Sequence, residues 1–152
     1  MDSVSSNSAF YAGEFRHQLD EKHRVTIPSR WRRSGAGEEF LMVPEPNGQF
    51  LLVMPPHEFE KISAAAESVA GVTARDLRTF FRQLHAQAQH GASDKQGRLV
   101  LPDDLCKKLD LKREIALVGG RGRFEIWNLK RREVAHTEEH PTYQHVANMV
   151  GL

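Results

Sequence analysis

Two copies of one motif organise this chain: Asp20-Glu21-Lys22-His23-Arg24-Val25-Thr26-Ile27-Pro28 and Asp94-Lys95-Gln96-Gly97-Arg98-Leu99-Val100-Leu101-Pro102. Both copies read Asp-x-x-x-Arg, then three apolar or β-branched residues, then Pro. They lie 74 positions apart, and the same offset relates Gly48 to Gly122 and Phe50 to Phe124. An internal repeat that covers this much of a chain indicates duplicated structural units. The sequence therefore predicts two similar halves packed about a pseudo-two-fold axis.

Each copy of the motif falls at a predicted turn between strands. Residues 14–19 alternate weakly between polar and apolar side chains and residues 25–27 favour a strand, so residues 14–27 predict a β-hairpin. Pro28 and Pro102 suit the first turn of a helix. The other predicted elements of the two halves are short helices at 29–33 and 103–109 and strands at 40–43, 50–54, 115–118 and 123–127. Each half therefore predicts a hairpin, a short helix and a second hairpin, which gives an α+β fold.

The two copies differ at the last position of the turn. The second copy has Gly97 there, and glycine adopts a positive φ angle easily. The first copy has His23, which adopts that conformation less readily. The first turn is therefore the poorer fit to the pattern.

Two helices are predicted between the halves. One follows Pro55-Pro56 and covers 57–70, and the second begins after Thr73, which makes a capping-box pattern with Asp76. The second helix has apolar residues on one face and, on the opposite side, a stripe of three arginines, Arg75, Arg78 and Arg82. This stripe is either a solvated face or a supporting basic surface.

Composition limits the class of protein. A chain of 152 residues with 39% hydrophobic content buries one or two small cores. No apolar run approaches the roughly 20 residues of a membrane span, and Met1–Ser8 lacks the pattern of an export signal. The single cysteine, Cys106, forms no internal disulfide, which fits a reducing compartment. We therefore expect a cytoplasmic protein without membrane contact.

Positive charge gathers around the repeated motif. Residues 15–35 hold six basic side chains against two acidic ones, and residues 73–101 hold five against two, although the whole chain has a net charge of only +1. Such asymmetry indicates an anionic partner or, alternatively, the solvated face of an ordinary domain.

The side chains of the motif suit contact with nucleic acid. Arginine binds a guanine edge through two parallel hydrogen bonds, and lysine supplies a point charge to phosphate. Lys22, Arg24, Lys95 and Arg98 are the candidate DNA-binding residues, with His23 and Gln96 as further candidates. Asp20, Asp94 and Gly97 are interpreted as residues that stabilise the turns. The alternative is that each Asp–Arg pair only fixes its hairpin and touches no ligand.

An enzymatic interpretation rests on one motif. The stretch from His136 to His140 matches His-x-x-Glu-His, a spacing in which two histidines bind zinc beside a general base. Pro141 biases His140 away from helical geometry, and the polar surroundings offer no core to exclude water. Cys106 has no histidine partner placed for it and is interpreted as a packed helix residue. No catalytic residue, metal or cofactor is predicted, and the chain is not expected to be an enzyme.

The two motif copies, extended to Leu19 and Ser93, give the chain a family resemblance. Together with Val118-Gly119-Gly120 and residues 123–127, they resemble the MraZ family of bacterial transcriptional regulators, which consist of two AbrB-like (SpoVT/AbrB) units. The resemblance covers about residues 10 to 130. The chain departs from the family pattern at His23, where Gly is usual, so either the first turn differs in geometry or His23 adds a contact to DNA.

The resemblance implies a fold, a partner and an assembly. It implies SpoVT/AbrB-like halves at 14–60 and 91–132, linking helices at 61–90 and a C-terminal tail at 133–152, which the polar sequence predicts to be frayed or partner-dependent. The halves would interleave in a swapped-hairpin β-barrel. MraZ-like proteins form homo-oligomeric rings, associate with the nucleoid, and bind double-stranded DNA at short direct promoter repeats of the division and cell-wall gene cluster, which they usually repress. The alternative function is a barrel-type protein-interaction module, antitoxin-like or a scaffold subunit, without specific DNA readout.

Overall fold

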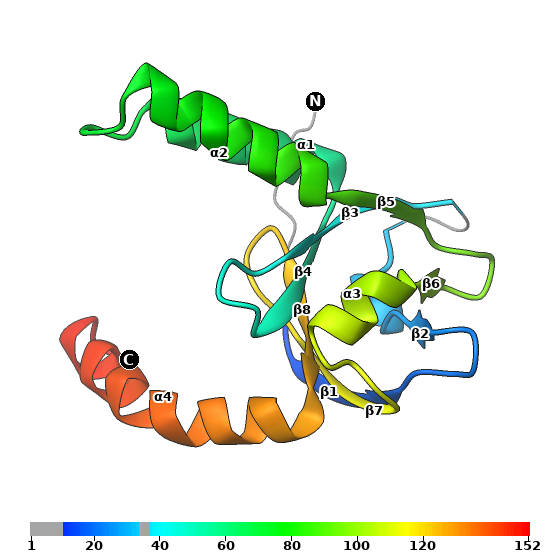
Figure 1. Ribbon diagram of the computed structural model, residues 1–152. Helices are drawn as coiled ribbons and strands as arrows, with labels where there is room; N and C mark the ends of the chain where they lie inside the picture. Colours follow the sequence, from blue (N-terminus) through cyan, green and yellow to red (C-terminus); the bar gives the residue numbers. More distant parts are fainter. Residues whose placement is uncertain (1–10, 34–36) are drawn as a thin grey trace, which may run out of the picture.

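The computed structural model describes residues 11–33 and 37–152; the Met1–Ser8 stretch lies outside the described residues. The strands predicted at 40–43, 50–54, 115–118 and 123–127 lie within one residue of the observed ones, and Figure 1 shows how all the elements are arranged. In chain order the elements are β1 (Glu14–Gln18), β2 (Arg24–Thr26), η2 (Ser29–Trp31), β3 (Glu39–Pro44), β4 (Phe50–Met54), α1 (Pro56–Glu67), α2 (Ala74–Gln87), β5 (Gln89–Ala92), β6 (Arg98–Val100), α3 (Asp103–Lys108), β7 (Glu114–Val118), β8 (Phe124–Asn128) and α4 (Leu129–Met149).

The strands form one six-stranded sheet and one two-stranded ribbon, and every strand pair among the described residues is antiparallel. The order in the large sheet is β1-β7-β8-β4-β3-β5, and β2 pairs with β6 in the ribbon. The repeat makes β1 equivalent to β5, β7 to β3 and β8 to β4, so the order reads the same from both ends. The pseudo-two-fold axis predicted from the repeat therefore passes between β4 and β8 and through the ribbon.

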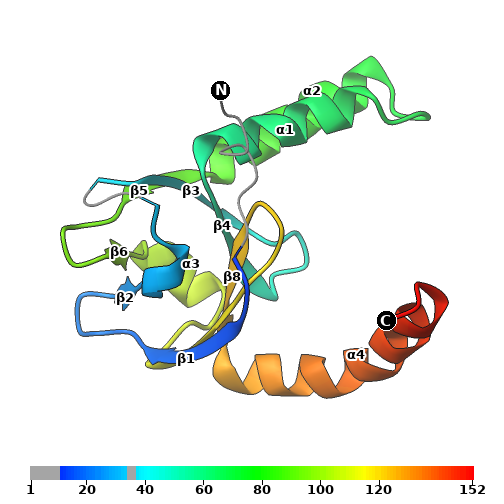
Figure 2. The same cartoon turned by 180° about the vertical axis from the view of Figure 1, so that it is seen from behind.

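The predicted pairing of residues 14–27 as a local hairpin is wrong. Asp20 and Arg24 do close a turn, through the hydrogen bond from the Asp20 N–H to the Arg24 carbonyl at 3.1 Å. The two flanking strands nevertheless pair elsewhere, β1 with β7 and β2 with β6. Each strand of the first motif thus finds its partner in the other half of the chain. Figures 1 and 2 show the ribbon lying between the two ends of the curved sheet.

The core lies between the sheet and the ribbon. Phe40, Leu51, Phe124 and Ile126 from the three neighbouring strands β3, β4 and β8 are fully buried there. Trp31 packs against them, with its ring 5.1 Å from that of Phe124. The short helix predicted at 29–33 is only the single turn η2, because the chain becomes extended at Arg32, directly after the buried Trp31.

The two linking helices form a hairpin that projects from the sheet (Figure 1). Thr73 and Asp76 form the predicted capping box, with the Asp76 N–H donating to Thr73 Oγ1 at 3.0 Å. Leu84 and Ala88 pack on a small second core around Phe59. The predicted stripe Arg75, Arg78 and Arg82 is exposed.

The C-terminal stretch is a helix, so the predicted fraying is wrong, whereas its dependence on a partner stays a prediction. Helix α4 extends to Met149 and includes Pro141, and Figure 1 shows that it changes direction along its length, as proline inside a helix causes. The Asn128 side chain caps its first turn by accepting from the Arg131 N–H at 3.0 Å. Arg131 also donates to the carbonyls of Gly48 and Leu109, both at 3.2 Å. These contacts join the start of α4 to distant parts of the chain, which a local reading of polarity misses.

Candidate nucleic-acid interface

The first Asp-x-x-x-Arg turn, residues 20–24, is closed by the carboxylate of Asp20. Its Oδ1 accepts from the backbone N–H groups of Lys22 and Arg24, at 2.9 and 2.8 Å. Its Oδ2 accepts from Arg24 Nε at 2.6 Å. We call this turn loop 1. One carboxylate thus fixes both the backbone of loop 1 and the plane of the Arg24 guanidinium.

The second turn, loop 2 (residues 94–98), repeats this arrangement. Asp94 Oδ1 accepts from the N–H groups of Gln96 and Arg98, at 2.9 and 2.8 Å, and Oδ2 accepts from Arg98 Nε at 2.8 Å. In both loops these hydrogen bonds hold the pKa of the aspartate carboxyl below its usual value, and the largest cause is the bond from the backbone of the arginine. Both carboxylates are therefore charged at neutral pH.

The lowered pKa values predict an acid-dependent loss of stability. A carboxyl whose pKa is lower in the folded chain stabilises the fold above its unfolded pKa, and that contribution disappears as the pH falls through the folded pKa. The Asp20→Asn, Asp94→Asn double variant is therefore expected to lose less stability than the wild type as the pH falls below about 4, where aspartate ordinarily titrates. Urea unfolding followed by circular dichroism between acidic and neutral pH measures this difference. The exposed Glu60→Gln change is the control, and parallel curves for wild type and double variant would contradict the prediction.

His23 and Gly97 share the left-handed conformation, with φ angles of 58° and 77°. The first turn therefore keeps the geometry of the second despite its side chain. His23 also forms a contact of its own, because its Nδ1 lies 2.6 Å from Oδ1 of Asp103 at the start of α3. Arg32 occupies the space beside Gly97, where an added Cβ would lie 2.4 Å from Arg32 Nε.

The ribbon places the two arginines on one face. In its register Arg24 is opposite Val100, and Thr26 is opposite Arg98. Residues that are opposite each other, or two apart, point to the same side of a sheet. The four side chains therefore share one face, which we call the outer ribbon face. The Cα atoms of Arg24 and Arg98 are roughly 8 Å apart on it, from standard strand spacings.

The other face of the ribbon is part of the core. Val25 and Leu99 are 1% and 0% exposed. Two further hydrogen bonds of 2.8 Å join the ribbon ends, from the Ile27 N–H to the Gly97 carbonyl and from the Leu101 N–H to the His23 carbonyl. The outer ribbon face is thus presented by a rigid, packed element, as precise recognition requires.

The structure leaves the motif side chains available for contact. Lys22, Lys95 and Gln96 are exposed. The side chains of Arg24 and Arg98 are 28% and 32% exposed. Their Nε atoms bind the aspartates, and in the described part of the chain no hydrogen bond occupies their Nη atoms. Two Nη donors in a fixed plane are the group that a guanine edge or a phosphate accepts.

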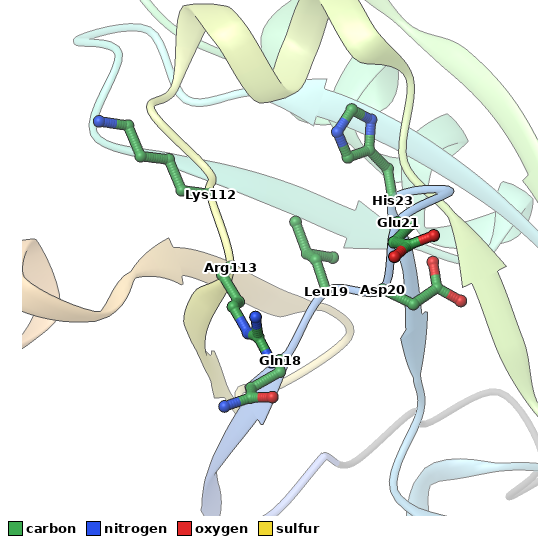
Figure 3. A pocket seen from close by; sticks show the side chains of 7 residues that line it. All are labelled: Gln18, Leu19, Asp20, Glu21, His23, Lys112 and Arg113. Atoms are coloured by element: carbon green, nitrogen blue, oxygen red, sulfur yellow. The ribbon is translucent and has the colours of Figure 1, made fainter.

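Loops 1 and 2 project from the same side of the molecule, whereas the α1–α2 hairpin and α4 extend from the other side (Figures 1 and 2). A pocket of about 570 Å³ lies beside loop 1 (Figure 3). Lys112 and Arg113 line one side of it, and Asp20, Glu21 and His23 line the other. The Leu19 N–H donates to the Arg113 carbonyl at 2.8 Å and so fixes loop 1 to this segment. The pocket's mixed charges suit no single class of small ligand.

The zinc-type motif and the cysteine singled out from the sequence form no metal or nucleophile site within the described residues. The rings of His136 and His140 lie 6.2 Å apart on α4, and within residues 11–33 and 37–152 no three His, Cys, Asp or Glu side chains are grouped to hold a metal ion. Cys106 is buried, and burial together with the charges of Asp103 and Asp104 raises the pKa of its thiol to about 11. No helix in the described part of the chain is both long and apolar enough to cross a membrane.

Comparison with known proteins follows the same two-part division. The fold and the paired loops define an α+β protein of two similar halves whose strands pair across the halves. The family model described as "MraZ protein, putative antitoxin-like" matches residues 10–80 and 84–151. The chain belongs to the MraZ family.

Similar proteins cover four fifths or more of the chain. A protein of Halothermothrix orenii named transcriptional regulator MraZ is 33% identical over 121 residues, which is 80% of this chain and 82% of that protein. A protein of Desulforamulus reducens with the same name is 32% identical over 143 residues, 93% of this chain and 99% of its own length. One from Acetivibrio thermocellus is 30% identical over 143 residues, covering 94% and 97%.

Proposed function

We propose that this chain is a transcriptional regulator that binds specific double-stranded DNA through loops 1 and 2. One observation carries the proposal: two matching Asp–Arg networks hold Arg24 and Arg98 on the exposed outer ribbon face. The similar proteins named transcriptional regulator MraZ support it. On this proposal the chain acts by binding and catalyses no reaction.

The outer ribbon face suits the major groove of DNA. The groove is wide enough to admit a two-stranded ribbon, and its guanine edges accept two hydrogen bonds from an arginine. Arg24 and Arg98 would supply the base contacts. Lys22 and Lys95 would bind phosphates beside them, with His23 and Gln96 as further contacts. Base contacts give specificity and phosphate contacts set the position of the protein on the duplex.

The assembly is part of the proposal. The two halves, 14–60 and 91–132, would complete a swapped-hairpin barrel, and several chains would form a ring on the nucleoid. Such a ring would engage successive direct repeats upstream of the division and cell-wall gene cluster and repress it. Linked binding sites raise the combined affinity by roughly 10² to 10⁴, which offsets the small contact area of a single ribbon.

A salt titration tests the proposal. The affinity for a DNA duplex taken from upstream of the protein's own gene is expected to fall steeply with salt concentration, because phosphates bound by the protein release their counterions. Changing Lys22 or Lys95 to glutamine should lower the magnitude of the slope of log affinity against log salt concentration by about 1 per protomer. It should also weaken binding to the specific and to the scrambled duplex by the same factor. Fluorescence anisotropy at several salt concentrations measures both effects.

A matched control and a contrary outcome complete this test. Lys61→Gln removes another exposed charge, on α1 and away from loops 1 and 2, and should leave the slope unchanged. If the wild type binds specific and scrambled duplexes equally weakly, a function as a sequence-specific regulator is excluded. The alternative function, a protein-interaction module, then remains.

A further inference from the structure

The outer ribbon face carries one exposed apolar residue, Val100. It is 53% exposed, although it belongs to a strand whose neighbour Leu99 is fully buried. Val100 lies directly opposite Arg24 and two residues from Arg98 in β6. Single exposed valines are common on protein surfaces, but here the valine is a direct neighbour of two arginines whose guanidinium groups are held by Asp20 and Asp94.

We infer that Val100 contacts the 5-methyl group of a thymine next to the guanines bound by the arginines; this inference rests on the proposed function. In the major groove the methyl group is the one apolar feature of a base edge, and apolar side chains recognise it. Val100 and Arg24 are directly opposite in the ribbon, so their side chains reach neighbouring points on one surface. An arginine and a valine side by side would therefore read a guanine and a thymine in adjacent positions.

The pseudo-symmetry makes this contact specific to one half. The repeat places Thr26 at the position equivalent to Val100, and Thr26 lies opposite Arg98. Threonine has one methyl group and one hydroxyl, so it accepts several bases. The two arginines are alike, but their neighbours differ, so the two halves of the outer ribbon face recognise different bases. The complex with DNA then has a defined direction, as direct repeats require.

Removing the thymine methyl groups tests the inference without changing the protein. Two DNA duplexes are compared. One has the sequence upstream of the protein's own gene, and the other has the same sequence with deoxyuridine in place of every thymidine. Loss of one contacted methyl is expected to weaken wild-type binding about 3- to 5-fold per protomer, from the transfer free energy of a buried methyl-sized group. The Val100→Ser variant should bind the thymidine duplex as weakly as the wild type binds the deoxyuridine duplex, and it should not distinguish the two.

The controls separate this contact from other effects. Val69→Ser changes a valine of similar exposure, 56%, in the loop after α1 and should keep the wild-type preference for thymidine. Val100→Thr introduces at position 100 the residue type of the equivalent position in the first half, Thr26. This variant should lose part of the preference for the thymidine duplex while keeping a high β-strand propensity at position 100. Thermal unfolding checks that each variant is folded.

Three outcomes decide between explanations. Equal sensitivity to methyl removal in the wild type and Val100→Ser overturns the inference, since the effect then comes from DNA shape. An unchanged DNA affinity with an altered oligomeric state of Val100→Ser also overturns it, because Val100 then belongs to a contact between chains. If the wild type binds neither duplex specifically, the proposed function itself fails.

Discussion

Changing Arg98 to alanine is expected to weaken binding to specific duplex DNA by about 5- to 150-fold, because a bidentate arginine–guanine contact contributes roughly 1–3 kcal/mol. Arg24→Ala should have an effect of the same size, since both arginines lie on the outer ribbon face in matching networks. The loss includes a second effect: without the guanidinium, the carboxylate of Asp94 or Asp20 faces DNA uncompensated. Anisotropy titrations with specific and scrambled duplexes measure the change.

Lysine substitutions show whether geometry or charge is responsible. Arg98→Lys keeps the charge but lacks the planar group that binds Asp94 and the base together, so most of the specific affinity should be lost. Binding to scrambled DNA should change little in the same variant. Arg78→Ala on the exposed face of α2 is the control for the positive charge that Arg98→Ala removes. An Arg98→Lys variant with wild-type specificity would show that loop 2 acts through charge alone.

Gly97→Ala is expected to destabilise the fold by about 2 kcal/mol, because a residue with a Cβ in the left-handed conformation costs roughly 1–2 kcal/mol and this Cβ also meets a neighbour. The new Cβ would lie 2.4 to 2.7 Å from atoms of the Arg32 guanidinium. Arg32 must then move, and its hydrogen bond from Nε to the Ile27 carbonyl, 2.9 Å long, is lost or weakened. Urea unfolding followed by circular dichroism measures the loss.

The equivalent position in loop 1 gives a control with the opposite expectation. His23→Gly relieves the left-handed strain, loses the exposed pair with Asp103, and increases the freedom of the unfolded chain. These effects nearly cancel, so the stability should stay within about 1 kcal/mol of the wild type. If His23→Gly were the more destabilising change, the contact with Asp103, and not the turn geometry, would hold loop 1 in place.

The elements of the fold could be predicted from local sequence, but their pairing could not. The strand at 50–54 and the capping box at Thr73 have the predicted positions. The choice of β7 as the partner of β1 depends on residues about 100 positions away, and a strand's own sequence carries no record of its partner. The extent of helix α4 was missed for a different reason. The repeat places Pro56 of α1 over Lys130, so a helix after β8 was already indicated by the first half, although its own sequence is polar.

The sequence predicted which residues form the candidate site, but it did not predict how they are arranged on one face. The repeated Asp-x-x-x-Arg pattern singled out Arg24 and Arg98 because charge and repetition coincide there. That the two share one face follows only from the register of β2 and β6. From the sequence, Val100 is an ordinary strand residue and Arg32 is one of several charged residues. The register shows that Val100 lies opposite Arg24, and the structure shows that Arg32 lies beside Gly97.

The crossed pairing also governs how the protein folds. The strands β1 and β2 are made early in synthesis, but their partners β7 and β6 lie between residues 98 and 118. Until those residues leave the ribosome, the first half exposes unpaired strand edges, which are prone to associate with other chains. Contacts between distant residues also slow folding, because a long loop must close before β1 can pair with β7 or β2 with β6. We therefore expect the two halves to fold together as a single cooperative unit.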